Sequence, residues 1–147
     1  MGQCWTKCWP QPCKQSSSNK DDATTELAGG NVQLVTTMEK WEKETSEANK
    51  DGKTVVVNFS ASWCIPCRQI AAAYRELAEK YCSSILFLTV DVDALAEFST
   101  TWDIKATPTF FVLRDGRQLD KLVGANKAEL QRKITAIAES NTRTSLN

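Results

Sequence analysis

The sequence predicts an α/β fold in which a central mixed β-sheet is flanked by helices. Apolar runs with strand character at 54–60 and 85–90 enclose a long stretch of helical periodicity, and this alternation is typical of parallel strands joined by crossover helices. An Asp115-Gly116 pair between two later strand patterns indicates a β-hairpin, which adds an antiparallel edge. The 147 residues leave room for one such domain and an appendage.

Residues 1–30 are predicted to form a flexible extension, because they are rich in Pro, Ser, Asn, Lys and Thr and contain little to bury. The opening MGQCWT matches the pattern for myristoylation of Gly2, and Cys4 stands where a palmitoyl chain is commonly attached. One myristoyl chain gives only marginal membrane affinity, so a second chain is needed for a stable anchor. We therefore predict lipidation at Gly2 and Cys4 and association with the plasma membrane. The alternative is a chance match to a short motif.

Two further cysteines, Cys8 and Cys13, lie in the same extension. They are additional candidates for palmitoylation, and together with Cys4 they are three candidate metal ligands. A metal site is disfavoured because no fourth ligand lies nearby and the chain contains no histidine.

Residues 31–140 are predicted to form the folded domain, followed by a polar C-terminal tail at 141–147 that frays. A first strand is expected at Val32–Val35. Thr36 with Glu39 three residues later forms a capping-box pattern that opens a helix, and the turn signal at 51–52 ends that helix.

The middle of the chain is predicted to supply two central strands and the helix between them. The apolar run at 54–60 is long enough for a strand covered on both faces. The helix that follows closes at Cys82, which is interpreted as a small, partly buried apolar residue, and carries a core-facing stripe of Ile70, Tyr74, Leu77 and Tyr81. After the strand at 85–90, Asp91 and Asp93 are interpreted as a polar strand end, because a calcium loop would need further ligands.

The last third of the domain is predicted to contain a short helix, a hairpin and a final helix. Apolar residues at 95, 98 and 102 indicate the short helix, and strands are expected at 106–113 and 118–123. Asn126 with Glu129 forms a second capping box, which opens the final helix. The complete order is β-α-β-α-β-α-β-β-α.

The chemistry centres on the segment 62–68, which carries Cys64-Ile65-Pro66-Cys67 between the 54–60 strand and the following helix. A cysteine at a helix N-terminus lies among unpaired backbone N–H groups at the positive end of the helix dipole, which favour thiolate over thiol. Cys64 is therefore the predicted nucleophile. Cys67 lies about one turn away on the same face, within reach of a disulfide, and is the predicted resolving thiol. Pro66 suits the first turn because its φ is already helical.

Composition excludes several other functions for this pair. A Cys-x-x-Cys can be half of a zinc site, but the chain has no second such pair and no histidine, so redox chemistry is favoured over a metal site or an inert pair. The absence of histidine also disfavours hydrolases that need an imidazole base.

Equal numbers of acidic and basic residues, 18 of each, argue against nucleic acid as a partner. No apolar run reaches the ~20 residues of a membrane span, so the expected compartment is the reducing cytoplasm.

Four motifs in this order resemble the thioredoxin family, specifically the plant h-type: FSASWCIPC at 59–67, VDVD at 90–93, WDIKATPTF at 102–110 and VGA at 123–125. The acylatable start at Gly2 and Cys4 resembles the membrane-associated branch of that type. The resemblance covers about residues 31–140 and implies the thioredoxin fold. It also implies a protein-disulfide reductase without a cofactor. In such an enzyme Cys64 attacks a target disulfide and Cys67 resolves the mixed disulfide. Thioredoxin reductase or a glutathione/glutaredoxin system then regenerates the dithiol.

The resemblance also assigns residues around the dithiol. The family's cis-proline falls on Pro108, and Thr107 offers backbone hydrogen bonds to a bound peptide. Trp63 and Gly124 would line the same substrate-binding surface.

The sequence departs from the family pattern at four positions. Ile65 replaces the usual glycine between the cysteines, which stiffens the turn and changes the surface offered to partners. Asn58 replaces a buried aspartate that assists deprotonation of the second cysteine, and Thr89 replaces its lysine companion. Ala72 replaces a helix-kinking proline, which favours a straighter helix. Ile65, Pro66 and Asn58 are therefore expected to tune the redox potential.

These departures leave two further hypotheses beside the reductase. One is a membrane-tethered redox adaptor or sensor with little turnover, favoured by Ile65, the missing Asp-Lys pair and the acylation motif. The other is a thiol-dependent isomerase, which the same dithiol chemistry permits.

Overall fold

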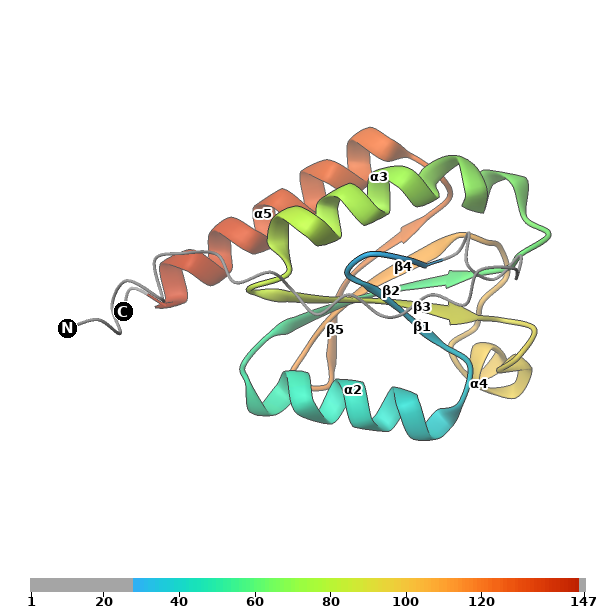
Figure 1. Cartoon of the computed structure of the whole chain (residues 1–147), viewed down its shortest axis with the longest axis horizontal. Helices are drawn as coiled ribbons and strands as arrows, with labels where there is room; N and C mark the ends of the chain where they lie inside the picture. Colours follow the sequence, from blue (N-terminus) through green and yellow to red (C-terminus); the bar gives the residue numbers. More distant parts are fainter. Residues whose placement is uncertain (1–27, 146–147) are drawn as a thin grey trace.

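The computed structural model describes residues 28–145, and the elements in this range follow the predicted order (Figure 1). They are β1 (Val32–Val35), α2 (Met38–Lys50), β2 (Thr54–Ser60), α3 (Ile65–Tyr81), β3 (Ile85–Asp91), α4 (Ala96–Thr101), β4 (Thr109–Arg114), β5 (Arg117–Val123) and α5 (Lys127–Ser145). The predicted mixed sheet flanked by helices is confirmed. No helix in this part of the chain combines the length and apolar character needed to cross a membrane.

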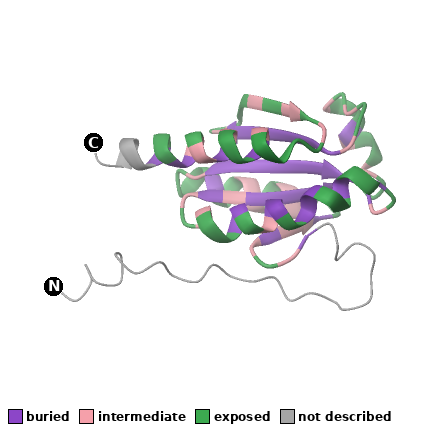
Figure 2. Ribbon diagram, turned by 90° about the horizontal axis from the view of Figure 1, so that it is seen from above, coloured by how far each residue is buried: buried purple, intermediate pink, exposed green. Residues whose placement is uncertain are grey.

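The sheet has the strand order β1-β3-β2-β4-β5 and is covered on both faces. Helices α3 and α5 pack on one face, and α2 and α4 on the other (Figure 1). The central strands are buried almost throughout, whereas β5, at the edge, is mostly exposed (Figure 2). Tyr74 ties α3 to the sheet, since its hydroxyl lies 3.0 Å from the Val56 carbonyl and 2.7 Å from the Leu88 carbonyl. Burial raises the pKa of Tyr74 well above its usual value, so it stays a neutral donor.

The parallel core expected from the alternation of strands and helices consists of β1, β3 and β2, and the hairpin strands β4 and β5 form the antiparallel edge. Strand β4 is antiparallel to its neighbour β2. The connection from β3 to β4 contains the six-residue helix α4. The chain re-enters the sheet from the end at which β3 leaves it.

The domain boundaries also differ from those predicted. Ala28, placed in the extension, is buried in the core cluster between the sheet and α3. At the other end, α5 continues past residue 140 to Ser145, so the tail predicted at 141–147 is helical over most of its length. Asn141, the first residue of the predicted tail, is buried and hydrogen-bonded to Thr54 of β2.

The helix starts follow from side-chain caps. Asn126 caps α5 as predicted, since its Oδ1 accepts the Glu129 N–H at 3.1 Å. For α2 the predicted cap is one residue early. Thr37, and not Thr36, accepts a backbone N–H, that of Lys40 at 3.2 Å.

The face of the sheet that packs against α3 and α5 is polar at both ends. Alternation along β2 places Thr54, Val56, Asn58 and Ser60 on this face, with apolar Val56 in the core cluster. Thr54, at the start of the strand, hydrogen-bonds Asn141 of α5. Asn58 and Ser60 lie near the other end, where the chain continues into the cysteine segment.

Candidate active site

Cys64 and Cys67 form a disulfide at the junction between β2 and α3, with their Cα atoms 5.2 Å apart. Cys64 is the N-cap of α3, with extended backbone angles, and its Sγ accepts the Cys67 backbone N–H at 3.3 Å. Ile65 and Pro66 occupy the first two helical positions, where an N–H has no intrahelical acceptor, so the missing N–H of Pro66 costs no hydrogen bond. The sequence therefore places one sulfur at the positive end of the helix and the other within its first turn.

The two sulfurs are recessed but lie close to the surface. Cys64 is 4% exposed and Cys67 is 1% exposed, and both pack with Ala61 and Val92. Cys64 is slightly the more accessible of the two residues.

A loop from a distant part of the chain completes the site. The Thr107-Pro108 peptide bond is cis, and the Thr107 carbonyl oxygen lies 3.4 Å from Cys64 Sγ. Gly124, at the end of β5, donates its backbone N–H to the Pro108 carbonyl at 2.8 Å. Its φ of +100° is a backbone conformation that favours glycine. Residues separated by 60 positions, from 64 to 124, thus meet around the sulfurs.

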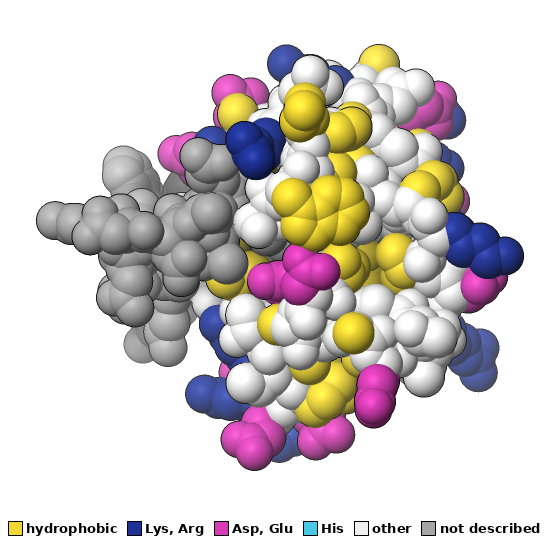
Figure 3. Space-filling model, turned by 90° about the vertical axis from the view of Figure 1, so that its right-hand side faces the viewer, with side chains coloured by type: hydrophobic (Ala, Val, Ile, Leu, Met, Phe, Trp, Pro, Cys, Tyr) yellow, Lys and Arg dark blue, Asp and Glu magenta, His cyan; other side chains and the backbone are white. Residues whose placement is uncertain are grey.

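Two large apolar side chains stand out from the surface beside the dithiol. Trp63 is 63% exposed and Ile65 is 64% exposed. Figure 3 views the molecule from this end, and hydrophobic side chains gather near the middle of that face. Trp63 is held in place because its Nε1 donates to Asp93 Oδ2 at 2.8 Å. An apolar surface of this kind around a reactive sulfur suits contact with another protein.

Two polar contacts at the site were not predicted from sequence. Asp93 was interpreted only as part of a polar strand end. That interpretation is consistent with the turn in which Asp91 Oδ1 accepts the Asp93 N–H, but it did not foresee the bond to Trp63. Arg68 donates from Nε and Nη2 to the Ser62 carbonyl, at 3.1 and 3.0 Å, which braces the segment before Cys64. Neither contact has a signal in sequence spacing, since each depends on how the loop is folded.

Two buried positions at this end of the sheet depart from the family pattern. Asn58 and Thr89 are register partners on β2 and β3 and are almost fully buried. Asn58 Oδ1, Thr89 Oγ1 and Ser60 Oγ have no hydrogen-bond partner among the described residues. Where the family pattern carries an aspartate and a lysine, this chain therefore has an amide and a hydroxyl side by side.

Cys82 lies away from this site, because it is the C-cap of α3 at the opposite end of that helix. The predicted lipidation residues Gly2 and Cys4, together with Cys8 and Cys13, lie outside the described residues. Within residues 28–145, no group of three or more candidate ligands could hold a metal ion.

Comparison with known proteins agrees with this geometry. The thioredoxin family model matches residues 32–136. The chain is 56% identical over 140 residues to a thioredoxin H-type from Populus jackii, covering 95% of this chain and 96% of that one. It is 55% identical over 130 residues to thioredoxin H9 from Arabidopsis thaliana, covering 87% and 92%.

Solved structures give the same result. The crystal structure of a wild-type poplar thioredoxin h superposes with a TM-score of 0.72 at 64% identity, covering 74% of this chain and 96% of that chain. The oxidised thioredoxin of Plasmodium falciparum superposes with a TM-score of 0.64 at 34% identity, covering 73% and 98%. A closed disulfide at a strand-to-helix junction, in a fold of this type, is the redox centre of a thiol-disulfide oxidoreductase. The chain therefore belongs to the thioredoxin family, with plant h-type thioredoxins among its relatives at high identity.

Proposed function

We propose that this protein-disulfide reductase uses Cys64 as the nucleophile and Cys67 as the resolving thiol. The observation that carries the assignment is the position of Cys64 Sγ, which caps α3 and accepts the Cys67 N–H at 3.3 Å. A hydrogen bond and a helix N-terminus both stabilise a thiolate. Cys67 lies inside the first turn and is less exposed, which suits a thiol that acts only after the target is bound.

The reaction consists of two exchanges that transfer two electrons to the target. The Cys64 thiolate attacks one sulfur of the target disulfide, and the other target sulfur leaves as a thiolate. Cys67 then loses its proton and attacks Cys64 Sγ, which releases the second target thiolate and closes the Cys64–Cys67 disulfide. An external thiol reductant, either thioredoxin reductase or a glutathione/glutaredoxin system that oxidises two glutathione molecules, returns two electrons and reopens the pair.

We assign target binding to the surface around Cys64. The Thr107 backbone lies beside the sulfur and can pair with an extended peptide, and Pro108 with Gly124 holds this loop in place. Trp63 supplies apolar contact area next to the cysteine. Together these residues would hold a target strand across the dithiol.

Ile65, Pro66 and Asn58 are assigned to tuning the redox potential. Ile65 lies between the sulfurs in the chain and is strongly exposed, so it stiffens the turn and adds apolar surface. Replacing it with glycine should shift the potential of the 64/67 couple by tens of millivolts, since ~30 mV corresponds to a tenfold change in the equilibrium constant. Titration against glutathione measures this shift, and an unchanged potential would remove Ile65 from the assignment.

Reduction of insulin disulfides tests the activity. The purified protein should reduce insulin with thioredoxin reductase or with glutathione and glutaredoxin as electron source, and the Cys64→Ser variant should be inactive with both. Failure of the unmodified protein with both reductants would favour the alternative of a redox adaptor with little turnover.

Trapping separates the two cysteine roles. A Cys67→Ser variant should accumulate mixed disulfides with many target proteins through Cys64, because the resolving step is removed. The Cys64→Ser variant is the matched control and should trap none of them. A single stable partner that is retained in the Cys64→Ser variant would point to an adaptor.

We further propose that the protein is cytoplasmic and attached to the plasma membrane by lipidation of Gly2 and Cys4. The sequence motif alone supports this step. A Gly2→Ala variant should move the membrane-bound fraction to the soluble fraction, and Cys4→Ser should do so partly. Unchanged partitioning of both variants would refute the anchor.

A further inference from the structure

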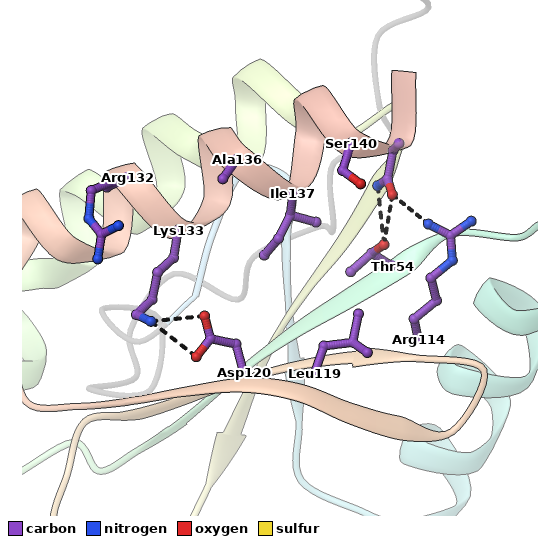
Figure 4. Close-up of a pocket in the computed structure, with 10 residues that line it drawn as sticks. Thr54, Arg114, Leu119, Asp120, Arg132, Lys133, Ala136, Ile137 and Ser140 are labelled. Carbon is purple, nitrogen blue, oxygen red and sulfur yellow. Dashed lines mark hydrogen bonds and ion pairs between the residues drawn. The ribbon is translucent and has the colours of Figure 1, made fainter. Parts of the chain in front are cut away.

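The sheet face covered by α3 and α5 has buried polar side chains at both of its ends. At the end farther from the dithiol, the Thr54 hydroxyl is hydrogen-bonded to Asn141, beside a cavity of about 270 Å³ between β5 and α5 (Figure 4). Lys133 and Asp120, which also line this cavity, are paired with each other at 3.0 and 2.8 Å. The folded chain itself supplies the partners of these polar groups.

The Ser60 hydroxyl, at the dithiol end of the same face, has no such partner. Ser60 is 1% exposed, and its Oγ is buried without a hydrogen bond to any residue that the structure describes. Native proteins keep few buried polar atoms in this condition, and a redox or catalytic role is one reason for keeping them. A serine hydroxyl can donate one hydrogen bond, so an acceptor that forms only in the reduced protein would account for it.

The position of α3 along β2 places Cys67 near Ser60. The two elements are joined by Tyr74, whose hydroxyl lies 3.0 Å from the Val56 carbonyl. Helix α3 runs back along the sheet from the end of β2 (Figure 1), and Cys67 precedes Tyr74 by seven residues, or about 10 Å of helix. Ser60 lies four residues beyond Val56, or about 13 Å of strand. Cys67 and Ser60 therefore lie at a similar level along the sheet.

Backbone contacts also join Ser60 to the surroundings of Cys67. The two sulfurs form a small cluster with Ala61 and Val92. Ser60 precedes Ala61 in the chain, and its carbonyl accepts the Val92 N–H at 3.0 Å. Alternation along β2 turns the Ser60 side chain toward α3, on the same face as Val56, which packs in the core cluster with α3.

A buried acidic side chain at this end of the sheet opposes a thiolate at Cys67. The charged and titratable groups on the elements at this end are Cys64, Arg68, Asp91, Asp93, Lys105 and Lys127, and both lysines are exposed. The Arg68 guanidinium is bonded to the Ser62 carbonyl at 3.0 Å. Asp91 is buried and is the register partner of Ser60, so its negative charge disfavours a second one at Cys67. A neutral donor offsets that cost.

We infer that the Ser60 hydroxyl donates a hydrogen bond to Cys67 Sγ when the disulfide is open, and so stabilises the Cys67 thiolate for the resolving step. A disulfide sulfur is a weak acceptor, whereas a thiolate forms a stronger, charge-assisted hydrogen bond, so the hydroxyl gains its partner on reduction. In the resolving step the Cys67 proton leaves to water and the thiolate forms a bond to Cys64 Sγ. The bond from Cys64 to the target sulfur breaks, and its electron pair leaves with the target. The inference rests on the proposed role of Cys67 as the resolving thiol.

Titration of Cys67 in the full-length Cys64→Ala variant tests the inference without requiring turnover. The NMR shift of the Cys67 ¹³Cβ atom, in selectively labelled protein, reports its ionisation. Adding Ser60→Ala should raise the pKa of Cys67, with a fall of at least about tenfold in its acid dissociation constant, because a hydrogen bond to a charged group is lost. Ser60→Thr keeps the hydroxyl and should keep most of the wild-type behaviour. An unchanged pKa in Ser60→Ala would overturn the inference.

Thr89→Val is the matched control in the same background. Thr89 is also buried with an unpaired hydroxyl, but it lies beside Asn58, farther from the cysteine segment. Thr89→Val should leave the pKa of Cys67 unchanged. An equal rise in Ser60→Ala and Thr89→Val would assign the effect to the general polarity of this region and would overturn the specific role of Ser60.

The protein with both cysteines provides a pH profile that a purely structural role would not produce. In equilibrium with glutathione, Ser60→Ala should favour the disulfide by about tenfold at a pH above the pKa of Cys67. The difference should shrink as the pH falls through that value, because a protonated thiol gains less from the donor. A difference that is constant with pH would count against the inference. Failure of the unsubstituted protein to reduce insulin would refute the proposed function instead, and the Cys67 titration would still decide the role of Ser60.

Discussion

The two polar ends of one sheet face are built in opposite ways. At the end away from the dithiol, the Thr54 hydroxyl and the Asn141 amide bond each other, and Asn141 also bonds Arg114 and the Ser84 carbonyl. At the dithiol end, Asn58 Oδ1, Ser60 Oγ and Thr89 Oγ1 are buried without a partner among the described residues. Both ends interrupt the same apolar face, but one is satisfied and the other is not.

The hydrogen-bonded end stabilises the fold. The end with unsatisfied polar atoms does not, so fold stability does not explain why those polar residues are there. A hydrogen bond between buried groups contributes about 1 kcal/mol, whereas a buried polar atom without a partner costs about 1 to 3 kcal/mol. The Asn141 cluster therefore fastens α5 to the sheet. The unsatisfied atoms lie where β2 leads into the cysteine segment, and a destabilising arrangement next to a reactive pair points to a functional reason for keeping it.

The largest effect is expected from Asn141→Leu. The change leaves the Thr54 hydroxyl and one side of Arg114 without their buried partner, so the free energy of unfolding should fall by about 2 to 4 kcal/mol. Urea unfolding measures the change. Insulin reduction by the folded variant should be unaffected, and a loss of stability below ~0.5 kcal/mol would contradict the assigned role of this cluster.

The next largest effect is expected from Asn58→Asp and depends on pH. Burial beside Thr89 and Ser60, with Asp91 as the register partner of Ser60, should raise the pKa of the introduced carboxyl above its ordinary ~3.9. Because the folded pKa is the higher one, the variant should match wild type at acid pH. It should lose about 2 kcal/mol as the pH rises through the folded pKa. Unfolding at pH 4 and pH 8 tests this expectation. Asn58→Leu is the control without a titrating group, and a pH-independent loss in Asn58→Asp would contradict the prediction.

A matched pair of threonine variants compares the two ends directly. Thr54 and Thr89 are both fully buried, but only the Thr54 hydroxyl is hydrogen-bonded. Thr54→Val should lower the free energy of unfolding by about 1 to 2 kcal/mol, whereas Thr89→Val should leave it unchanged or raise it slightly. If both variants lowered the free energy of unfolding equally, the hydrogen bond of the Thr54 hydroxyl would not distinguish the two ends.

The smallest effect is expected from Asp120→Asn at the rim of the cavity beside the Asn141 cluster. Lys133 lowers the pKa of Asp120, so this pair contributes stability at pH values above the ordinary aspartate pKa and loses it as the pH falls through the folded value. Because the Asp120 side chain is 40% exposed, the contribution should stay below about 1 kcal/mol at neutral pH. The stability difference between wild type and variant should therefore shrink between pH 7 and pH 3, and a constant difference would exclude the ion pair as its source.

Local sequence patterns were sufficient to predict the elements and the position of the dithiol. Strand and helix periodicity predicted the order of all nine described elements, and the Cys-x-x-Cys spacing predicted the disulfide between Cys64 and Cys67. The Asn126 cap was also predicted, because a cap depends on residues three apart in the chain. Each of these features is determined by neighbours within one or two turns.

Local patterns did not predict the features that depend on distant contacts, and the assignment of Thr107 and Pro108 to the surroundings of the dithiol came from the family resemblance. The local sequence predicts Asn141 to be a polar tail residue. It is buried because it is hydrogen-bonded to Thr54 of β2, which lies 87 positions earlier in the chain. Trp63 bonds Asp93 only because the ends of β2 and β3 are adjacent in the sheet. In each case the partner is absent from the local sequence.

By itself, the sequence determined a reversible dithiol at the start of a helix, because the geometry of a Cys-x-x-Cys in a first turn is a local property of the backbone. Only the tertiary structure decided what surrounds the two sulfurs: the Thr107 carbonyl, the exposed Trp63 and the neutral Asn58–Thr89 pair. The physical reason is that sheet order and register bring together residues from separate strands and loops, and no pattern within one segment encodes that placement.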